Sequence, residues 1–517
     1  MSLVTLDPKT GAQNPFVRLN PRDNVVVARL PLSAGKFKFE GRELNLPQGV
    51  GAGHKIAVEE IAAGASVLKY GEDIGTAREA IHPGELVHVH NLAFDVKDRQ
   101  YEFATSHTDL SHIPVLPDRS FLGYQRADGR AGTRNYVAIL GASNCASYAT
   151  RLIAREFERE SFAGTGIDGV VSFPHVDGCG QAEGADTQLL RRTLDGNADH
   201  PNVAAAVMIG LGCEVNQVSY YTRPEAAANG RSPRRGFTLQ ESGGTRKAVA
   251  DGIKAVWELI EQVGRQQRVP CDASKLVVAL ECGGSDAFSG ITSNPAVGYC
   301  SDLLVKQGGT VCLAETTEIY GAEHLLTRRS VNREVGEKLL AMLNWYMDYV
   351  ARFKDAPTFD SNPSPGNKAG GLTNIAEKSL GAVAKGGTSN LTAVYDFAER
   401  ITERGFVFMN TPGYDPTSVS GMAAGGCNLC LFTTGRGSAF GYPTVPVVKI
   451  ASNSKTGKFM DEDMDINAGT IADGEEDIAG VGTRMHRFVL DVASGKKTFS
   501  EALGYGEFIP WRIGPVL

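Results

Sequence analysis

The chain contains three apolar runs that each end in a glycine–cysteine element. They are YVAILGASNC, which ends at Cys145, VVSFPHVDGCG, which contains Cys179, and VAAAVMIGLGCEVNQ, which contains Cys213. Each run is short and rich in Val, Ala and Ile, which is typical of a strand that is buried on both faces of a parallel sheet. Open α/β sheets bind their ligands at the carboxyl ends of the strands. The pattern therefore predicts three cysteines at the ligand-binding edge of a sheet.

A fourth run, LVVALECGGSD, ends in the same way and carries Glu281, Cys282, Ser285 and Asp286. Glycine-rich loops at strand ends let a ligand approach the backbone, and polar groups beside the glycines can then hold it. We interpret this segment as part of a binding site.

Length and charge exclude several classes of protein. A chain of 517 residues is expected to divide into roughly two to four domains. The net charge of 52 − 59 = −7 gives no reason to expect nucleic acid or an anionic membrane as a partner. No stretch approaches the ~20 apolar residues of a membrane span, and the first residues lack the features of a signal peptide. These features predict a cytoplasmic protein, in which the nine cysteines are thiols or metal ligands rather than disulfides.

The sequence divides into four segments. Residues 1–105 contain short alternating strands separated by turn signals and predict a small all-β unit, and residues 106–121 read as a linker. Residues 122–270 and 271–517 repeat the order strand, glycine loop, helix, which predicts two α/β domains with mainly parallel sheets.

The strand-end cysteines have two interpretations. Three such thiols can hold an iron–sulfur cluster or another soft metal. Alternatively, they are small residues that fit tight loops. The C-x-x-C spacing of Cys427 and Cys430 does not favour a cluster, because it lies at the start of an apolar run that is predicted to be a strand.

Four of the ten histidines lie in two short strings, GHK and HPGELVHVHN. If the second string is a strand, His88 and His90 share one face and can bind one metal ion together with His54 or a carboxylate. The structural alternative is that these side chains pack within the β unit. His175 follows a predicted strand, where a general base or acid would be useful.

Two loops carry candidate binding residues. TTGRGSAFG follows a strand, and its Arg436 can clamp a carboxylate in bidentate fashion or simply be solvated. NPSPGNKAGG has no predicted secondary structure and contains Asn367 and Lys368, so it is either a lid or a surface excursion. The string GTGIDG at residues 164–169 precedes a strand instead of following one, which argues against a dinucleotide loop.

Long collinear stretches resemble the altronate and galactarate dehydratase family of sugar-acid dehydratases. They include GHKIAVEEI, KYGEDIG, GYQRADGRAGTRN, HVDGCG, ECGGSDAFSGITSNPAVG, NPSPGNKAGGLTNIAEKSLG and FTTGRGSAFG. The resemblance implies that the amino-terminal unit is a SAF domain with a compact β-clip fold, followed by two α/β regions. HVHN is similar to the altronate type, whereas SDAFSGITSNPAVGYCSDLLVKQGGTV and DINAGTIADGEE are similar to the galactarate type.

The resemblance also implies an activity, which is the metal-dependent removal of water from a hexarate or hexonate to give a 2-keto-3-deoxy sugar acid. The divalent ion is expected to be Fe²⁺ or Mn²⁺. The candidate metal ligands are His54, His88 and His90, with Cys145, Cys179, Cys213 and Cys282 as alternatives. The catalytic candidates are His175, His54 and Lys368, and the candidates for substrate binding are Arg436, Asn216, Ser285, Asp286 and Asn367.

Two other functions remain open at this point. A relative of this family eliminates sulfite from sulfolactate, so a carbon–sulfur lyase is one alternative. A non-catalytic sugar-acid-binding protein is the other, although the sequence shows no DNA-binding module. An exposed sheet edge or helix face would allow a homodimer.

Overall fold

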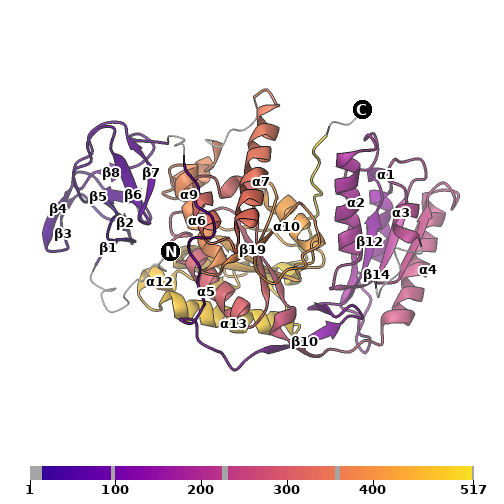
Figure 1. Cartoon of the computed structure of the whole chain (residues 1–517). Coiled ribbons are helices and arrows are strands. Elements are labelled where there is room, and N and C mark those ends of the chain that lie inside the picture. Colours follow the sequence, from indigo (N-terminus) through magenta and orange to yellow (C-terminus); the bar gives the residue numbers. More distant parts are fainter. Residues whose placement is uncertain (1–13, 95–98, 224–230, 356–360, 515–517) are drawn as a thin grey trace.

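A computed structural model describes residues 14–94, 99–223, 231–355 and 361–514. It consists of three bodies in a row, with the last part of the chain in the middle (Figure 1). The amino-terminal β unit lies at one end of the row and the second domain lies at the other. The expected fold is confirmed, because a strand-rich SAF unit precedes two α/β domains with parallel sheets.

The β unit is built from short antiparallel strands in three small sheets. The first sheet contains β1 (Phe16–Val17), β2 (Val25–Ala28), β5 (Lys55–Ala57) and β8 (Leu86–Val87) in that order. The second contains β6 (Ser66–Lys69), β7 (Glu72–Ala77) and β9 (Leu92–Ala93), and the third is the hairpin of β3 (Gly35–Phe39) and β4 (Arg42–Leu46). β2 and β5 are buried along their whole length, so the apolar residues of the alternating runs form the core of this unit.

The second domain has a four-stranded parallel sheet in the order β13-β12-β14-β15. Its elements are β12 (Tyr136–Gly141), α1 (Asn144–Glu156), β13 (Gly169–Phe173), α2 (Ala185–Ala198), β14 (Val203–Gly210), α3 (Ser219–Thr222), β15 (Arg234–Thr238) and α4 (Thr245–Val263). Every residue of β14 is buried, as the continuous apolar run predicts for a strand covered by helices on both faces.

The C-terminal domain has a seven-stranded parallel sheet in the order β19-β20-β18-β17-β21-β22-β23. The strands are β17 (Val277–Cys282), β18 (Thr310–Leu313), β19 (Leu391–Tyr395), β20 (Gly405–Met409), β21 (Leu429–Thr434), β22 (Val447–Ala451) and β23 (Ile466–Asn467). The helices are α5 (Ser293–Lys306), α6 (Glu323–Arg328), α7 (Arg333–Ala351), α8 (Pro365–Ala369), α9 (Ile375–Ala382), α10 (Asp415–Ala424), α11 (Ser454–Phe459), α12 (Thr470–Asp473), α13 (Ile478–Ala493) and α14 (Phe499–Leu503), with short 3₁₀ turns η3 (Ala273–Lys275), η4 (Thr316–Glu318) and η6 (Val383–Gly386). Among the described residues, no helix combines the length and apolarity that crossing a membrane requires.

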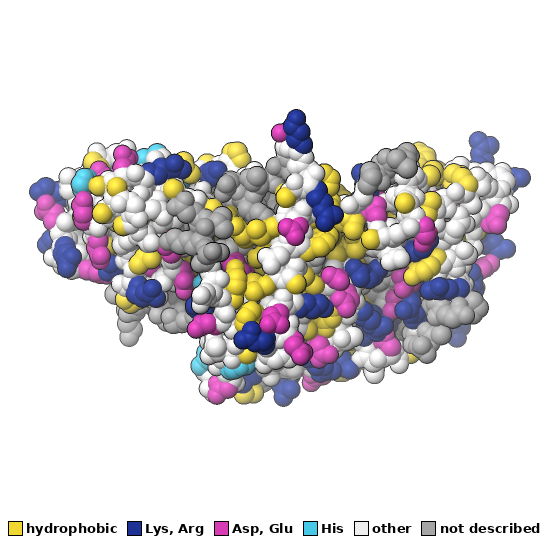
Figure 2. Space-filling view, turned by 45° about the horizontal axis from the view of Figure 1, so that its top comes forward, with side chains coloured by type: hydrophobic (Ala, Val, Ile, Leu, Met, Phe, Trp, Pro, Cys, Tyr) yellow, Lys and Arg dark blue, Asp and Glu magenta, His cyan; other side chains and the backbone are white. Residues whose placement is uncertain are grey.

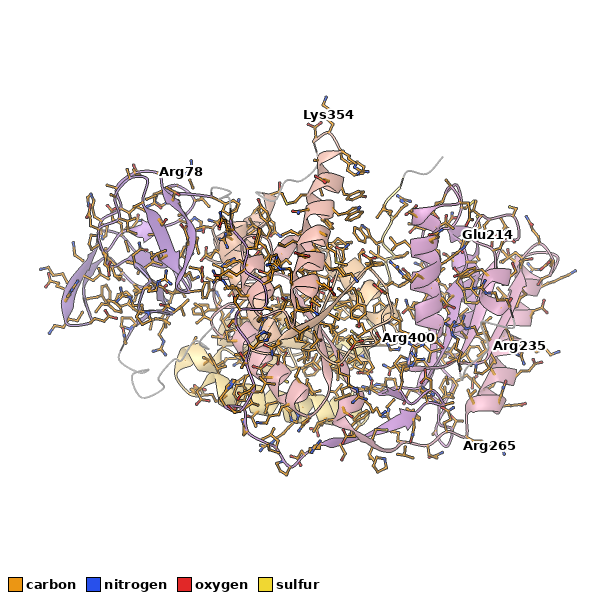
Figure 3. All side chains as sticks on the ribbon, in the orientation of Figure 1. Arg78, Glu214, Arg235, Arg265, Lys354 and Arg400 are labelled. Carbon is orange, nitrogen blue, oxygen red and sulfur yellow. The ribbon has the colours of Figure 1, made fainter. Side chains whose placement is uncertain are left out.

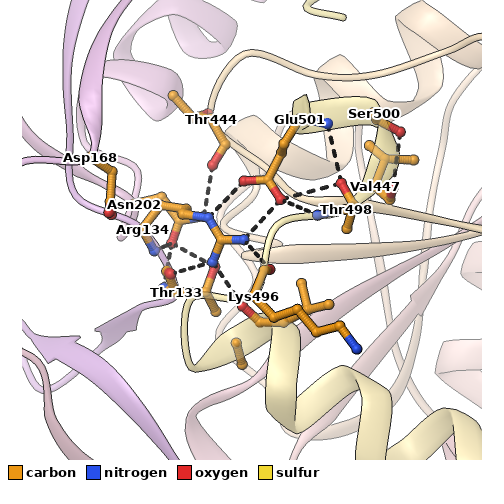
Figure 4. A network of polar contacts seen from close by, with 12 residues as sticks. Thr133, Arg134, Asp168, Asn202, Thr444, Val447, Lys496, Thr498, Ser500 and Glu501 are labelled. Atoms are coloured by element: carbon orange, nitrogen blue, oxygen red, sulfur yellow. Dashed lines mark hydrogen bonds and ion pairs between the residues drawn. The ribbon is translucent and has the colours of Figure 1, made fainter. Parts of the chain in front are cut away.

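The second and C-terminal domains are joined through a small antiparallel sheet and a buried arginine. The sheet pairs β10 (Ser120–Gln125), on the way into the second domain, with β16 (Val269–Asp272), on the way out, and β11 (Ala131–Gly132) completes it. Arg134 then crosses to the C-terminal domain and binds both carboxylate oxygens of Glu501, at 2.7 and 2.8 Å (Figure 4). Its guanidinium also donates to the carbonyls of Thr133, Val492 and Lys496.

Replacing Arg134 by Met should lower the urea midpoint of unfolding, measured by circular dichroism. Arg134 is 2% exposed, and removing one partner of a buried ion pair leaves an uncompensated charge at a cost of about 3–5 kcal/mol. The matched control is Arg333→Met, which removes an exposed pair with Glu337 and should change stability by less than about 0.5 kcal/mol. Equal midpoints for the two variants would contradict this role of Arg134.

Candidate active site

A group of buried carboxylates lies at the carboxyl edge of the seven-stranded sheet. Glu281 and Cys282 end β17, Glu315 follows β18 directly, and Glu318 ends the 3₁₀ turn η4. Asp415 is the first residue of α10, which begins after β20. Because neighbouring parallel strands end at the same edge, side chains that are far apart in sequence meet here.

Two lysines from the opposite side neutralise part of this charge. Lys378 in α9 lies with its Nζ 2.6 Å from Glu318 Oε1, and Lys385 in η6 lies with its Nζ 3.1 Å from Glu315 Oε2. The Cys282 thiol is 3.5 Å from Glu315 Oε2 and 3.6 Å from Glu318 Oε2. The backbone of Glu315 has φ +64°, a left-handed conformation that non-glycine residues seldom adopt and that often marks a functional site.

The buried carboxylates outnumber the two ammonium groups, so the pKa of each carboxyl depends on whether a lysine or another carboxyl lies beside it. Burial, and then the neighbouring Glu315, raises the pKa of Glu281 well above its ordinary value. Burial also raises the pKa of Asp415 to about 7, with Glu315 and Glu318 acting in the same direction. Burial opposes ionisation of Glu318 as well, but Lys378 overcomes it and holds the pKa of that carboxyl below its usual value.

One carboxylate oxygen on each of two glutamates receives no donor from another group of the described residues. Glu281 Oε2 accepts a bond of 2.7 Å from the Ser418 hydroxyl, whereas Glu281 Oε1 and Glu315 Oε1 are buried, and the two carboxyls lie close enough to share a proton with each other. Buried polar atoms are normally satisfied, so each exception requires an explanation. Within the described chain, the ligand atoms of Cys282, Glu315 and Glu318, and likewise those of Glu281, Glu315 and Asp415, lie within 4.8 Å of one another.

A cavity of about 760 Å³ opens onto these groups. Its polar lining includes Cys282, Glu318, Asn362, Lys378 and Asp415, and its opposite wall is aromatic, from α7. Figure 2 shows apolar side chains gathered on both sides of this projecting helix. A space of this size, with a polar floor and an apolar wall, fits a small organic molecule.

The loop predicted as a lid contributes to this cavity. Asn362, Ser364 and Asn367 line it. Asn367 lies in the first turn of α8, where its side chain and that of Ser364 form a reciprocal capping box. The Asn367 amide also donates to the Ser285 carbonyl at 2.8 Å, which ties the loop to the end of β17. The side-chain amide of Asn367 is therefore used to hold the loop.

Two of the three predicted histidine ligands meet. The rings of His54 and His88 lie 5.3 Å apart, and both bind the backbone of α8, His54 at Ala369 and His88 at the Lys368 carbonyl. The expectation that His88 and His90 share a strand face is wrong, because β8 ends at Val87 and the HVHN string forms a turn. His90 is exposed there, and the three histidines are not among the described groups with ligand atoms within 4.8 Å of one another.

The other predicted residues have varied surroundings. Asp286 is buried and accepts hydrogen bonds from Ser289, Ser452 and Asn453. Arg436 is exposed, but its backbone N–H donates to the carbonyl of Gly284, which lines the cavity. Lys368 is half-buried at the end of α8.

His175 and Asn216 lie in the second domain, apart from the carboxylates. His175 Nε2 is 2.7 Å from the Gly141 carbonyl, and His175 Nδ1 accepts from the Asp177 N–H at 3.2 Å. Both ring nitrogens are therefore engaged with backbone, which disagrees with a free general base. Asn216 donates to the Ala142 carbonyl and accepts from the Tyr221 hydroxyl, so its amide is also occupied.

Several charged residues of this site were missed by the sequence analysis. They are Glu315, Glu318, Lys378, Lys385 and Asp415. The two glutamates follow the apolar run GGTVCLAE, so the strand-end reasoning applied to Cys282 could have found them. The lysines lie inside helical segments, and their contribution depends on how α9 packs against the sheet.

The chain matches known proteins over most of its length. The profile for the D-galactarate/altronate dehydratase C-terminal domain matches residues 273–516, that for the D-galactarate dehydratase/altronate hydrolase second domain matches residues 123–264, and that for the altronate/galactarate dehydratase SAF domain matches residues 14–95. Galactarate dehydratase (L-threo-forming) of Escherichia coli strain K12 is 38% identical over 95% of each chain, and altronate dehydratase of the same organism is 36% identical over 97% of this chain and all of its own. The (2R)-sulfolactate sulfo-lyase subunit beta of Chromohalobacter salexigens is 35% identical over 77% of this chain and 98% of its own.

These matches define an enzyme of the hydro-lyase class. The chain belongs to the galactarate/altronate dehydratase family, as the sequence motifs indicated.

His175 should affect the pH dependence of stability. Burial lowers the pKa of His175 to about 4 from its ordinary value of 6.5. The folded state therefore resists protonation, and the stability that a neutral His175 contributes above pH 6.5 is lost as the pH falls toward 4, by up to about 3 kcal/mol. We expect His175→Asn to have a smaller loss of stability over this interval, measured by urea unfolding at a series of pH values.

The exposed His82 provides a control of opposite sign. A hydrogen bond from the His82 ring to the Glu60 carboxylate raises the pKa of His82, so His82→Asn should not reduce the acid sensitivity. If His175→Asn instead kept the full acid sensitivity of the wild type, the neutral buried state of His175 would be refuted.

Proposed function

We propose that this enzyme removes water from a hexarate or hexonate and forms a 2-keto-3-deoxy sugar acid in the cavity lined by Glu318, Lys378 and Asp415. The observation that carries the proposal is the excess of buried acid at this edge, where four carboxylates face two ammonium groups. A buried excess of two negative charges is costly unless protons or a cation neutralise it. The galactarate and altronate dehydratase relatives support the substrate class.

A divalent cation fits this set of residues. Glu281 Oε1 and Glu315 Oε1 are buried and receive no donor from any other described group, and a carboxylate-rich site with one thiol suits Fe²⁺ or Mn²⁺. Glu315 belongs to both groups of possible ligands, with Glu281 and Asp415 or with Cys282 and Glu318. When bound, the ion stabilises negative charge on the substrate carboxylate as the proton leaves C2.

The residues that line the cavity are suited to moving protons. Elimination requires a base for the C2 proton and an acid for the departing C3 hydroxyl, and the resulting enol becomes the 2-keto product on protonation at C3. Asp415 and Glu318 present carboxylates to the cavity, and Lys378 presents an ammonium that Glu318 and Asn362 orient. We assign the base to one of these carboxylates and the donor for the hydroxyl to Lys378. Arg436 and Lys368, near the cavity, are candidates for the distal carboxylate or hydroxyls of the substrate.

The sulfolactate reaction is the second candidate, because a relative named as a sulfo-lyase subunit covers 77% of this chain. Both reactions begin with a proton next to a carboxylate, and they differ only in the group that leaves C3. The product distinguishes them.

The activity test is an anaerobic assay with Mn²⁺ or Fe²⁺ and a panel of hexarates, hexonates and sulfolactate. We expect a 2-keto-3-deoxy acid from one or two sugar acids, with loss of turnover after chelation. Glu315→Gln should lower turnover by about 10²-fold or more, and the control Glu337→Gln, on the exposed face of α7, should retain it. Sulfite release from sulfolactate, with no product from any sugar acid, would overturn the proposed substrate class.

Metal affinity distinguishes the carboxylates from the histidines. We expect Mn²⁺ titration, followed by the loss of the free-ion electron paramagnetic resonance signal, to show a site in wild type and in His54→Ala but not in Glu315→Gln. The reason is that Glu315 is shared by both carboxylate groups, whereas His54 binds the backbone of the loop. If His54→Ala lost the Mn²⁺ site and Glu315→Gln kept it, the histidines would be the metal ligands instead of the carboxylates.

A further inference from the structure

Three cysteines of the second domain differ from the rest of the chain in their exposure. All nine cysteines are free, and Cys145 and Cys213 are exposed while Cys179 is half-buried. The other six are buried, and apart from Cys282, which lines the cavity, they lie where a thiol packs as a small apolar group. The three accessible thiols follow β12, β13 and β14, which are neighbours in the order β13-β12-β14. They therefore lie at one edge of one sheet.

Hydrogen bonds hold the three cysteine loops together. The Asn144 N–H donates to the Asp177 carbonyl at 2.7 Å, which joins the first loop to the second. Asn216 of the third loop donates through its N–H to the Gly178 carbonyl at 3.4 Å and through its amide to the Ala142 carbonyl at 2.8 Å. Each cysteine lies within three residues of one of these bonds, so the bonds fix the positions of the three loops relative to one another.

The close approach of the first two loops requires glycine. Gly178 has φ +92°, and a Cβ atom there would lie 2.4 Å from the Ala142 carbonyl oxygen and 2.8 Å from the Ser143 Cα. No side chain fits at that distance. Cys179 is therefore held directly over the start of α1, where Cys145 lies in the first turn.

The electrostatics of this edge favour a cation. The Cys145 and Cys179 side chains are close enough to interact with each other, so two thiolates at these positions would repel each other. The Ser143 hydroxyl is fully buried at the base of the same loop and interacts with the Cys145 thiol. A metal group bound by both thiolates would remove this repulsion.

The spacing of the thiols distinguishes between the possible metal groups. The three cysteines are not among the described groups whose ligand atoms lie within 4.8 Å of one another, as a single tetrahedral ion would require. An iron–sulfur cluster separates its cysteine sulfurs further, because its irons and sulfides lie between them. We propose that Cys145, Cys179 and Cys213 hold a four-iron iron–sulfur cluster. Because such clusters have four iron corners, three thiolates leave one iron without a cysteine ligand.

This edge adjoins the carboxylate cavity through the end of the chain. Arg512 binds Asp177 of the Cys179 loop at 3.0 Å, and the preceding Trp511 stacks on Tyr346, with ring centroids 5.7 Å apart. Tyr346 lines the cavity. In Figure 3, Glu214, next to Cys213, and Lys354, beyond the end of α7, both lie toward the upper side of the molecule. The proposed cluster site is separate from the divalent-cation site proposed above. The cavity wall and the three cysteine loops are linked by Trp511 and Arg512, which are adjacent in the sequence.

The test is anaerobic reconstitution of the full chain with ferrous iron and sulfide, followed by desalting. We expect a broad visible absorbance, and iron and acid-labile sulfide in equal amounts. Cys145→Ser, Cys179→Ser and Cys213→Ser should each reduce this absorbance and sulfide content at least severalfold. Cys300→Ala, which alters a buried cysteine of α5, should retain both.

Absorbance, iron and sulfide are measured without substrate. A negative result for the cluster therefore does not depend on whether the proposed dehydratase activity is correct. Circular dichroism of each serine variant checks that the fold is retained, which is expected because the mutated side chains are not in the core. Absence of sulfide in the wild type, iron without sulfide, or serine variants that keep the cluster content of the wild type would each overturn the proposal. A Cys145–Cys179 disulfide in protein purified without oxygen would also overturn it.

Discussion

The excess of carboxylate over ammonium at the edge of the seven-stranded sheet is the constraint on which this account depends. Glu281 and Glu315 are 0% and 1% exposed, so water cannot stabilise their charges. Lys378 and Lys385 are buried beside them, and they balance half of the acid. Protons or a divalent cation are needed to neutralise this excess, and the proposed function rests on a cation that the substrate carboxylate would share.

The β unit depends on a second buried charge group. Lys55 and Lys69 both bind Glu377 of α9, at 2.9 and 2.7 Å, and Lys55 also donates to the Gly371 carbonyl. Burial opposes ionisation of Glu377, but the two lysines hold its pKa well below the usual range. Burial lowers the pKa of Lys55 to about 8. Lys378, which lines the cavity, follows Glu377 directly in α9. The ion pairs that hold the β unit against α9 therefore also help to position Lys378.

The fold was predictable because its signals are local. The all-apolar run of β14 and the run ending in Glu281 and Cys282 both formed buried parallel strands, as continuous apolar segments predict. The boundary of β8 was not predictable, since alternation in VHVHN is compatible with a strand and the chain turns at His88 instead. Pattern alone does not show where a turn begins when tertiary contacts with α8 compete with strand pairing.

The site was predictable only in part. Strand-end reasoning located Cys282, and its extension to Glu315 would have followed from the same rule. Lys378 and Lys385 belong to helical segments with no motif, and only packing brings their ammonium groups to the carboxylates. Histidines drew attention because they are common metal ligands, yet His175 proved to be held by backbone on both ring nitrogens.

The most direct test is an anomalous difference map from crystals grown with Mn²⁺, collected at the manganese absorption edge. The account predicts one strong peak beside Glu315, within coordination distance of its carboxylate and of Glu281, Cys282, Glu318 or Asp415. A peak between His54 and His88, with none beside Glu315, would contradict it.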